Sequence, residues 1–98
     1  MTQVSIDEAG NLRFTFKEVN NDSAVIYKLL NAGEVEFVNG ECVGLELLDF
    51  ERQLNRGKIN DVSLVDAQLY NDDFIFNIDV DGQTINGKVS MASLKDKI

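Results

Sequence analysis

Short runs of alternating apolar and polar residues fill the C-terminal third of the chain, and this period of two predicts strands. Asn71-Asp72 and Asp81-Gly82 separate three such runs, and both pairs suit two-residue hairpin turns. The resulting register pairs Leu69 with Phe74, Ala67 with Phe76, Val65 with Ile78, Ile78 with Ile85, Phe76 with Gly87 and Phe74 with Val89. The other face carries Asp66, Gln68, Asn77, Asp79, Thr84 and Asn86. A three-stranded antiparallel meander is therefore predicted over residues 62–91.

A second hairpin is predicted around Asn39-Gly40, and the hydrophobic pattern decides between two turns. A two-residue loop would mix acids and hydrophobes on both faces, because it pairs Glu36 with Val43 and Phe37 with Cys42. A three-residue loop of Val38, Asn39 and Gly40 pairs Val35 with Val43 and extends that face through Phe37, Leu45 and Leu47. The opposite face then carries Glu34, Glu36, Cys42, Gly44 and Glu46. The pattern favours the three-residue loop, with a left-handed Gly40 in a bulge.

The remaining segments predict two strands and a short helix. Residues 12–16 alternate as a strand, and Asp49 is a plausible N-cap for a helix that ends at Gly57. Phe50 and Leu54 lie four residues apart and would dock this helix on the sheet. Residues 23–32 are ambiguous: their β-branched run favours a strand, whereas Asp22 and Gly33 would cap a helix. We favour the strand.

These elements predict one domain over residues 1–98, because 98 residues suffice for one core and leave little room for a second. Residues 1–57 would supply strands, the hairpin and the helix, and residues 58–98 the meander. The expected class is mainly β (α+β), as an antiparallel sheet or a small barrel-like meander of about six strands with one short helix.

The net charge of −8 is unevenly spread along the chain. Between Lys28 and Arg52 there are no basic residues, but six acids: Glu34, Glu36, Glu41, Glu46, Asp49 and Glu51. A second such window, from Lys58 to Lys88, holds Asp61, Asp66, Asp72, Asp73, Asp79 and Asp81. Such a surface repels phosphate backbones and anionic lipid, so direct binding of nucleic acid or membrane is not expected. These acids either favour a basic protein partner or only keep the domain soluble.

Composition also argues against enzymatic chemistry, metal sites and cofactors. The chain has no histidine and one cysteine, so the common zinc, copper and non-haem iron ligand sets cannot be assembled. Cys42 is expected beside Glu34, Glu36 and Glu46, where a thiolate is disfavoured. The same glutamates lack the cleft that a catalytic pair of acid and base needs. Gly44 and Gly87 lie inside predicted strands, where they suggest bulges or close backbone approach.

One stretch imitates part of a calcium loop. Asn77, Asp79, Asp81 and Gly82 match its first positions, but Lys88 stands where such a loop ends in a bidentate glutamate. The flanking segments read as strands rather than helices, so a hairpin explains these residues better.

Neither end of the chain suggests export or a membrane span. Residues 1–10 carry two acids and lack the basic and apolar regions of a signal peptide. No apolar run approaches the roughly 20 residues that a spanning helix needs, so a cytoplasmic location is expected.

Two segments resemble a family of short bacterial domains of unknown function. Residues 7–16, DEAGNLRFTF, are similar to its opening strand of the type D-x-L-Y-I-x-L, and residues 40–50, GECVGLELLDF, to its V-G-I-E-I-L-D-A run. The resemblance covers residues 1–56, with Arg13 in place of an aromatic residue and Phe50 in place of a small one. It implies a small bacterial module, some relatives being antitoxin-like, and it carries over no catalytic residue.

Taken together, these observations predict a non-enzymatic interaction module, antitoxin-like or inhibitor-like, that binds a basic protein through an acidic sheet face. The expected contact residues are Glu34, Glu36, Glu41, Glu46, Asp49 and Glu51. The alternative is a structural or assembly protein that forms a homo-oligomer through its sheet edges or through the Phe50 and Leu54 region.

Overall fold

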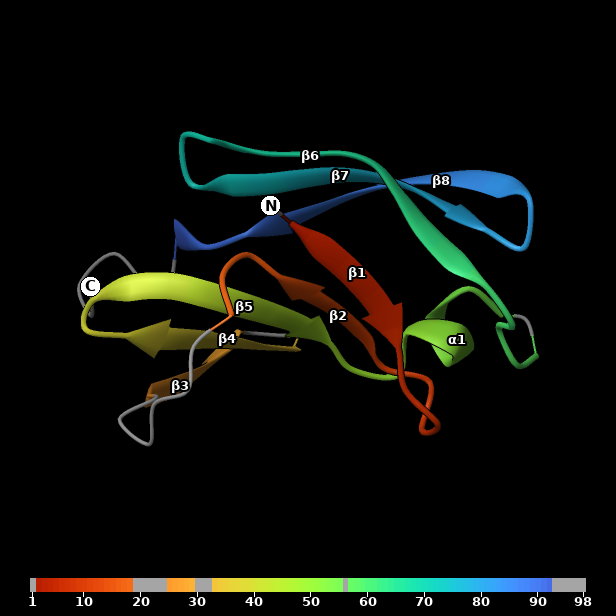
Figure 1. The fold of residues 1–98 in the computed structure, drawn as a ribbon, viewed down its shortest axis with the longest axis horizontal. Coiled ribbons are helices and arrows are strands. Elements are labelled where there is room, and N and C mark those ends of the chain that lie inside the picture. The colour runs from red at the N-terminus through yellow and green to blue at the C-terminus, as the bar shows by residue number, and fades with distance from the viewer. Residues whose placement is uncertain (1, 19–24, 30–32, 56, 93–98) are drawn as a thin grey trace.

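Two antiparallel sheets face each other in the computed structural model, which describes residues 2–18, 25–29, 33–55 and 57–92. The larger sheet has the strand order β1-β2-β5-β4-β3, and the smaller has the order β6-β7-β8 (Figure 1). The strands of the first are β1 (Gln3–Ile6), β2 (Leu12–Thr15), β3 (Val25–Leu29), β4 (Gly33–Val38) and β5 (Glu41–Leu47). Those of the second are β6 (Val62–Tyr70), β7 (Asp73–Val80) and β8 (Gln83–Ser90), and the helix α1 (Phe50–Gln53) precedes them. The mainly β prediction is confirmed.

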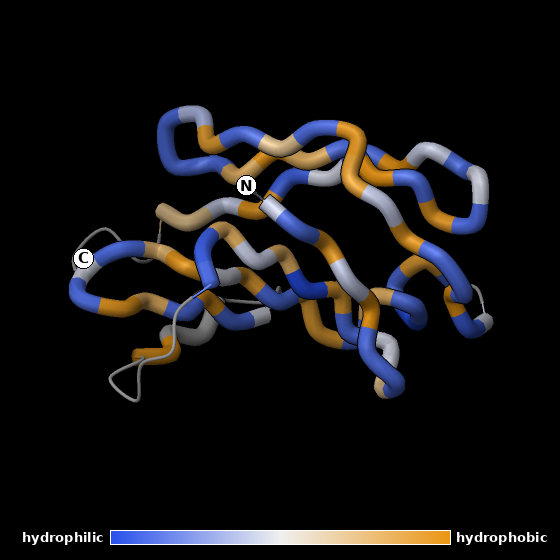
Figure 2. The backbone as a smooth tube through the Cα atoms, in the orientation of Figure 1, coloured by the Kyte–Doolittle hydropathy of each residue, from blue (hydrophilic) through white to orange (hydrophobic). Residues whose placement is uncertain are grey.

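Aromatic rings from both sheets meet in the core. The Phe14 ring from β2 lies 5.0 Å from that of Phe74 and 4.9 Å from that of Phe76, both on β7. One hydrophobic cluster joins these residues to Leu12, Val35, Phe37, Leu45, Leu47, Phe50, Ile59, Ile78, Val80 and Val89. Apolar and polar residues alternate along most strands (Figure 2), so the hydrophobic period of two places one side of each sheet in this core.

The C-terminal meander is confirmed with one correction. Leu69 faces Phe74, Ala67 faces Phe76, Ile78 faces Ile85, Phe76 faces Gly87 and Phe74 faces Val89, as predicted. However, Ile78 pairs with Leu64 and not with Val65, because the register shifts between Leu64 and Asp66. Val65 is the extra residue of this bulge, and it is 57% exposed.

The predicted turn of the middle hairpin is wrong. The loop has two residues, Asn39 and Gly40, both with positive φ, which is the turn that an Asn-Gly pair prefers. Phe37 therefore pairs with Cys42, and a bulge in β5 places Val43 between the partners of Phe37 and Glu36. Because one extra residue reverses the alternation, Cys42 packs against the core and does not join the acidic face.

The helix is shorter than predicted and begins differently. Asp49 has a left-handed backbone (φ 55°) and makes no side-chain capping bond. Its N–H donates instead to Oδ1 of Asn11, at 2.9 Å. The predicted docking is confirmed, because Phe50 is buried in the core and Leu54 packs against it.

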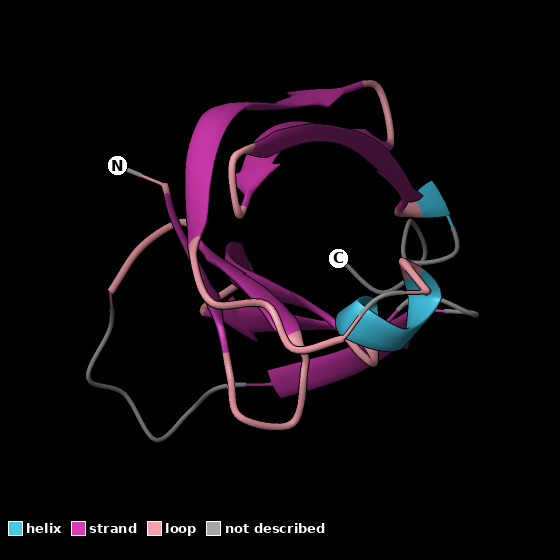
Figure 3. Ribbon diagram, turned by 90° about the vertical axis from the view of Figure 1, so that its right-hand side faces the viewer, coloured by secondary structure: helices cyan, strands magenta, loops and turns pink. Residues whose placement is uncertain are grey.

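Two strands lie at the edges of the larger sheet. β1 was not predicted; it pairs with β2 and approaches β6, which brings the two sheets together on one side, as the turned view shows (Figure 3). β3 confirms the strand reading at residues 25–29, and residues 23–24 and 30–32 of that prediction lie outside the described residues.

Candidate functional site

Three of the predicted contact residues share the outer face of the larger sheet. Glu34 on β4 stands directly opposite Glu46 on β5, and Glu36 stands opposite Gly44. Like charges placed opposite each other destabilise a sheet, so Glu34 and Glu46 form an unfavourable pair unless a cation lies between them. The alternation of the two strands thus gathers these acids, as the sequence pattern indicates.

Arg13, a cation of the chain itself, lies on this face. Arg13, the β2 neighbour of Glu46, donates from Nη2 to Oε1 of Glu36 at 2.6 Å. Its guanidinium occupies the space that a side chain at Gly44 would fill, so a side chain, and not the backbone approach predicted from the sequence, lies against this glycine. The acidic face is therefore partly neutralised from within, which weakens it as a docking surface.

The other three predicted contact residues lie elsewhere. Glu41, at the tip of the hairpin, pairs with Lys17 at 3.3 Å, and both side chains are largely exposed. Asp49 and Glu51 belong to the start of α1. Oε2 of Glu51 accepts the N–H of Ile59 at 2.6 Å, and its side chain lies against Gly10. Glu51 therefore holds two chain segments together, and the six acids do not form one surface.

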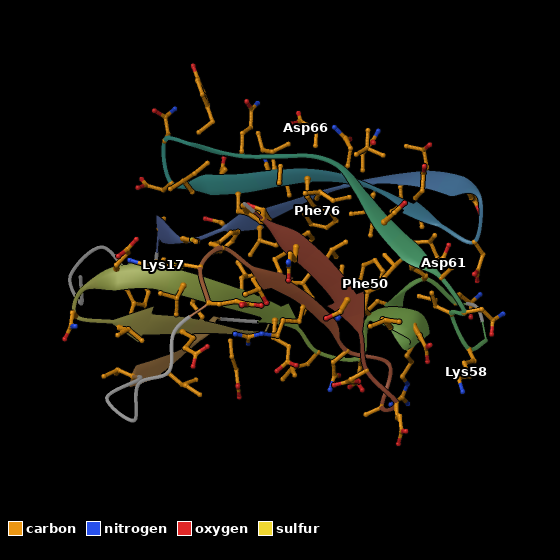
Figure 4. All side chains as sticks on the ribbon, viewed as in Figure 1. Lys17, Phe50, Lys58, Asp61, Asp66 and Phe76 are labelled. Carbon is orange, nitrogen blue, oxygen red and sulfur yellow. The ribbon has the colours of Figure 1, made fainter. Side chains whose placement is uncertain are left out.

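The structure shows an apolar edge strand that sequence reasoning missed. β6 is an outer strand of the smaller sheet, and within the described ranges it forms strand pairs only with β7. It exposes Val65 (57%), Leu69 (64%) and Tyr70 (64%), whereas β8, the opposite edge, is mostly polar. Among the described residues, no hydrogen bond beyond the ladder with β7 involves residues 65–70. In Figure 4 Asp66 lies on the outer side of this strand, away from the core residue Phe76.

A pocket of about 230 Å³ opens between the two sheets beside this strand. Its walls are mostly apolar: Thr2, Phe16 and Cys42 from the larger sheet or its ends, and Ala67, Gln68, Leu69, Phe74 and Met91 from the smaller sheet or just after it. Leu69 belongs both to the exposed edge and to the pocket wall. We call residues 65–70 together with this pocket the β6 site.

Cys42 is the reactive side chain of the pocket, and its environment keeps it protonated. Burial raises the pKa of the Cys42 thiol; a backbone hydrogen bond at Gly44 lowers it by less, and the nearby Glu36 carboxylate raises it further. A neutral thiol is a poor nucleophile, so Cys42 acts here as an apolar wall residue.

The calcium-like residues are engaged within the hairpin. Thr84 donates to Oδ1 of Asp79 at 2.8 Å, and Oδ1 of Asp81 accepts the N–H of Asp61 at 2.8 Å. Within the described ranges, no group of three or more potential ligands could hold a metal ion. Over the same ranges, no helix has the length and apolar character needed to cross a bilayer.

Comparisons with family models, with curated proteins and with solved structures each found no match. The resemblance of residues 1–56 to short bacterial domains therefore stays a prediction.

Proposed function

We propose that this chain is a non-enzymatic protein-interaction module that binds a basic partner protein through the β6 site. The observation that carries the proposal is the outer edge of β6, which exposes Val65, Leu69 and Tyr70 beside an apolar pocket. Edge strands are open to pairing with other chains, and soluble proteins usually protect them with charge or cover. Tyrosine is also enriched among the residues that contribute most of the binding energy of an interface.

Charge supports a basic partner at this site. Residues 58–92 contain six aspartates and only two lysines, Lys58 and Lys88. This acidic composition would speed association with a positively charged partner.

The site proposed here differs from the acidic face expected from the sequence. Arg13 neutralises Glu36 on that face, and Glu51 has a structural role near α1. Phe50 is buried in the core, so it cannot form an interface between copies of the chain. The basic partner and the cytoplasmic location expected from the sequence remain part of the proposal, and the proposed contact surface is β6.

Affinity capture with matched variants tests this function. The immobilised chain is exposed to lysate of the source organism, beside a Leu69→Ser and Tyr70→Ser double variant and a Val25→Ser and Ile26→Ser control. The control removes comparable exposed apolar residues from β3, where Val25 is 49% and Ile26 57% exposed. Urea denaturation first checks that both variants fold, since exposed substitutions usually change stability by less than about 0.5 kcal/mol.

The proposal predicts that wild type and control retain the same basic protein, that the β6 variant loses it, and that salt releases it. Capture of nothing at low ionic strength, or equal capture by all three chains, would count against the proposal.

A further inference from the structure

We infer that the partner binds as an added strand: an extended segment pairs with β6 and becomes the fourth strand of the smaller sheet. This inference rests on the proposed function and specifies how the β6 site is used. The strand available is residues 66–70, which follow the Val65 bulge and, among the described residues, form strand pairs with β7 alone. At ~3.3 Å per residue, five residues offer an edge roughly 16 Å long.

The sheet geometry sends alternate side chains of such a segment into the pocket. Ala67 and Leu69 pair with Phe76 and Phe74, and all four belong to the face turned toward the larger sheet. Side chains of a neighbouring strand in register with Ala67 and Leu69 would point the same way. There they would meet Thr2, Phe16 and Cys42 on the opposite wall.

The size of the pocket suits a side chain better than a free ligand. A volume of about 230 Å³ is below the range of roughly 300–1,000 Å³ typical of pockets for drug-sized molecules. An apolar cavity of about 150 Å³ already admits benzene, so one large aliphatic or aromatic side chain fits. Apolar residues are therefore expected at alternate positions of the partner segment.

The opposite positions of the added strand face a polar and acidic surface. Asp66, Gln68 and Tyr70 pair with Asn77, Ile75 and Asp73, so two carboxylates flank this side of the edge. Lys88, in register with Ile75, is the one basic residue of β8. Lysine or arginine at the outward positions of the segment would complement these aspartates.

Charge also decides between such a segment and a second copy of this chain. A symmetric pairing of two β6 strands would bring two chains of net charge −8 together, with Asp66 of each near the shared edge. Like charges at this separation oppose the contact. A segment with alternating apolar and basic residues would pair with the same edge and fill the same pocket without that repulsion.

Selection from a library of displayed random nonapeptides on the full chain tests the inference. The selected peptides are expected to alternate apolar with Lys or Arg and to bind the control Val25→Ser and Ile26→Ser variant equally well. Binding should fall at least tenfold for the Leu69→Ser and Tyr70→Ser variant, and bound peptide should slow alkylation of Cys42. N-methylation of the peptide amides that face β6 should weaken binding at least tenfold, while methylation of the other edge leaves it unchanged, because only one edge of an added strand pairs.

Three results would overturn strand addition: no peptide selected, binding indifferent to both methylation patterns, or a dimer in sedimentation that the β6 variant abolishes. If these occurred while lysate capture still depended on Leu69 and Tyr70, the interaction function would stand and only its mode would be wrong. If capture failed as well, the proposed function would fail with it.

Discussion

The ring of Phe76 on β7 lies against Gly87, its cross-strand partner on β8. A Cβ atom at Gly87 would collide with the outer atoms of this ring, and Phe76 is only 3% exposed. The glycine is thus needed for close approach, as its position inside a strand indicates. The ring that covers it also contacts Phe14 from the other sheet, so one small residue supports the contact between the sheets.

Gly87→Ala should therefore destabilise the fold by about 1–3 kcal/mol, since the buried Phe76 ring has to move in a packed core. Urea denaturation measures the change, and Gly57→Ala is the control, because nothing lies within 4 Å of a Cβ there and its φ is not positive. Equal stability of the two variants would show that the ring adapts freely.

Arg13→Gln should lower the free energy of unfolding by up to about 1 kcal/mol, because the ion pair with Glu36 is only partly shielded from solvent. The loss should shrink as salt is added, since the variant leaves Glu34, Glu36 and Glu46 with less positive charge nearby. Lys17→Gln is the comparison: its pair with Glu41 is more exposed, so its removal should have little effect. A larger loss for Lys17→Gln would contradict this ranking.

Glu51→Ala should destabilise the chain by about 1–3 kcal/mol, because the N–H of Ile59 would lose its acceptor in a partly buried position. Glu41→Ala, on the exposed hairpin tip, should change stability by less than about 0.5 kcal/mol. Neither folded variant should lose the captured partner. If the Glu51→Ala chain lost the captured partner while its stability was unchanged, Glu51 would belong to the binding surface.

The rate at which iodoacetamide alkylates Cys42 should be low near neutral pH. This rate should still increase at pH values above the one at which the thiol of the urea-unfolded chain is fully ionised. The reason is that burial raises the pKa of the folded thiol above its unfolded value. The same shift means that this thiol stabilises the fold below its unfolded pKa, and that this contribution is lost as pH rises toward its folded pKa. An equal pH dependence of the alkylation rate in the folded and unfolded chains would contradict the buried position of Cys42.

The hydrophobic pattern predicted each described strand except β1 and most of the register of the meander, and it failed at two bulges. Each bulge holds one extra valine that has no register partner on the strand it is paired with: Val43 in β5, opposite β4, and Val65 in β6, opposite β7. Adjacent apolar residues, such as Leu64 and Val65, fit either side of a strand, so the pattern cannot show which one is extra. The bulge at Val43 also moved Cys42 from the acidic face to the core side.

The candidate site was harder to predict than the fold. Alternation alone gathers Glu34, Glu36 and Glu46, but the neighbour of β5 on its other side, β2, brings Arg13 among them, and this pairing joins segments about thirty residues apart. Likewise Leu69 lies on the predicted inner face, yet it is 64% exposed in the wall of an open pocket. Edge positions depend on strand order, which hairpin patterns do not reveal.

Amide hydrogen exchange of the chain, alone and with the captured partner, tests the central claim most directly. Strand addition predicts new protection at backbone amides within residues 65–70, with little change at Glu34, Glu36 and Glu46. Protection confined to β4 and β5, with β6 unchanged, would contradict the account and restore the acidic face as the binding surface.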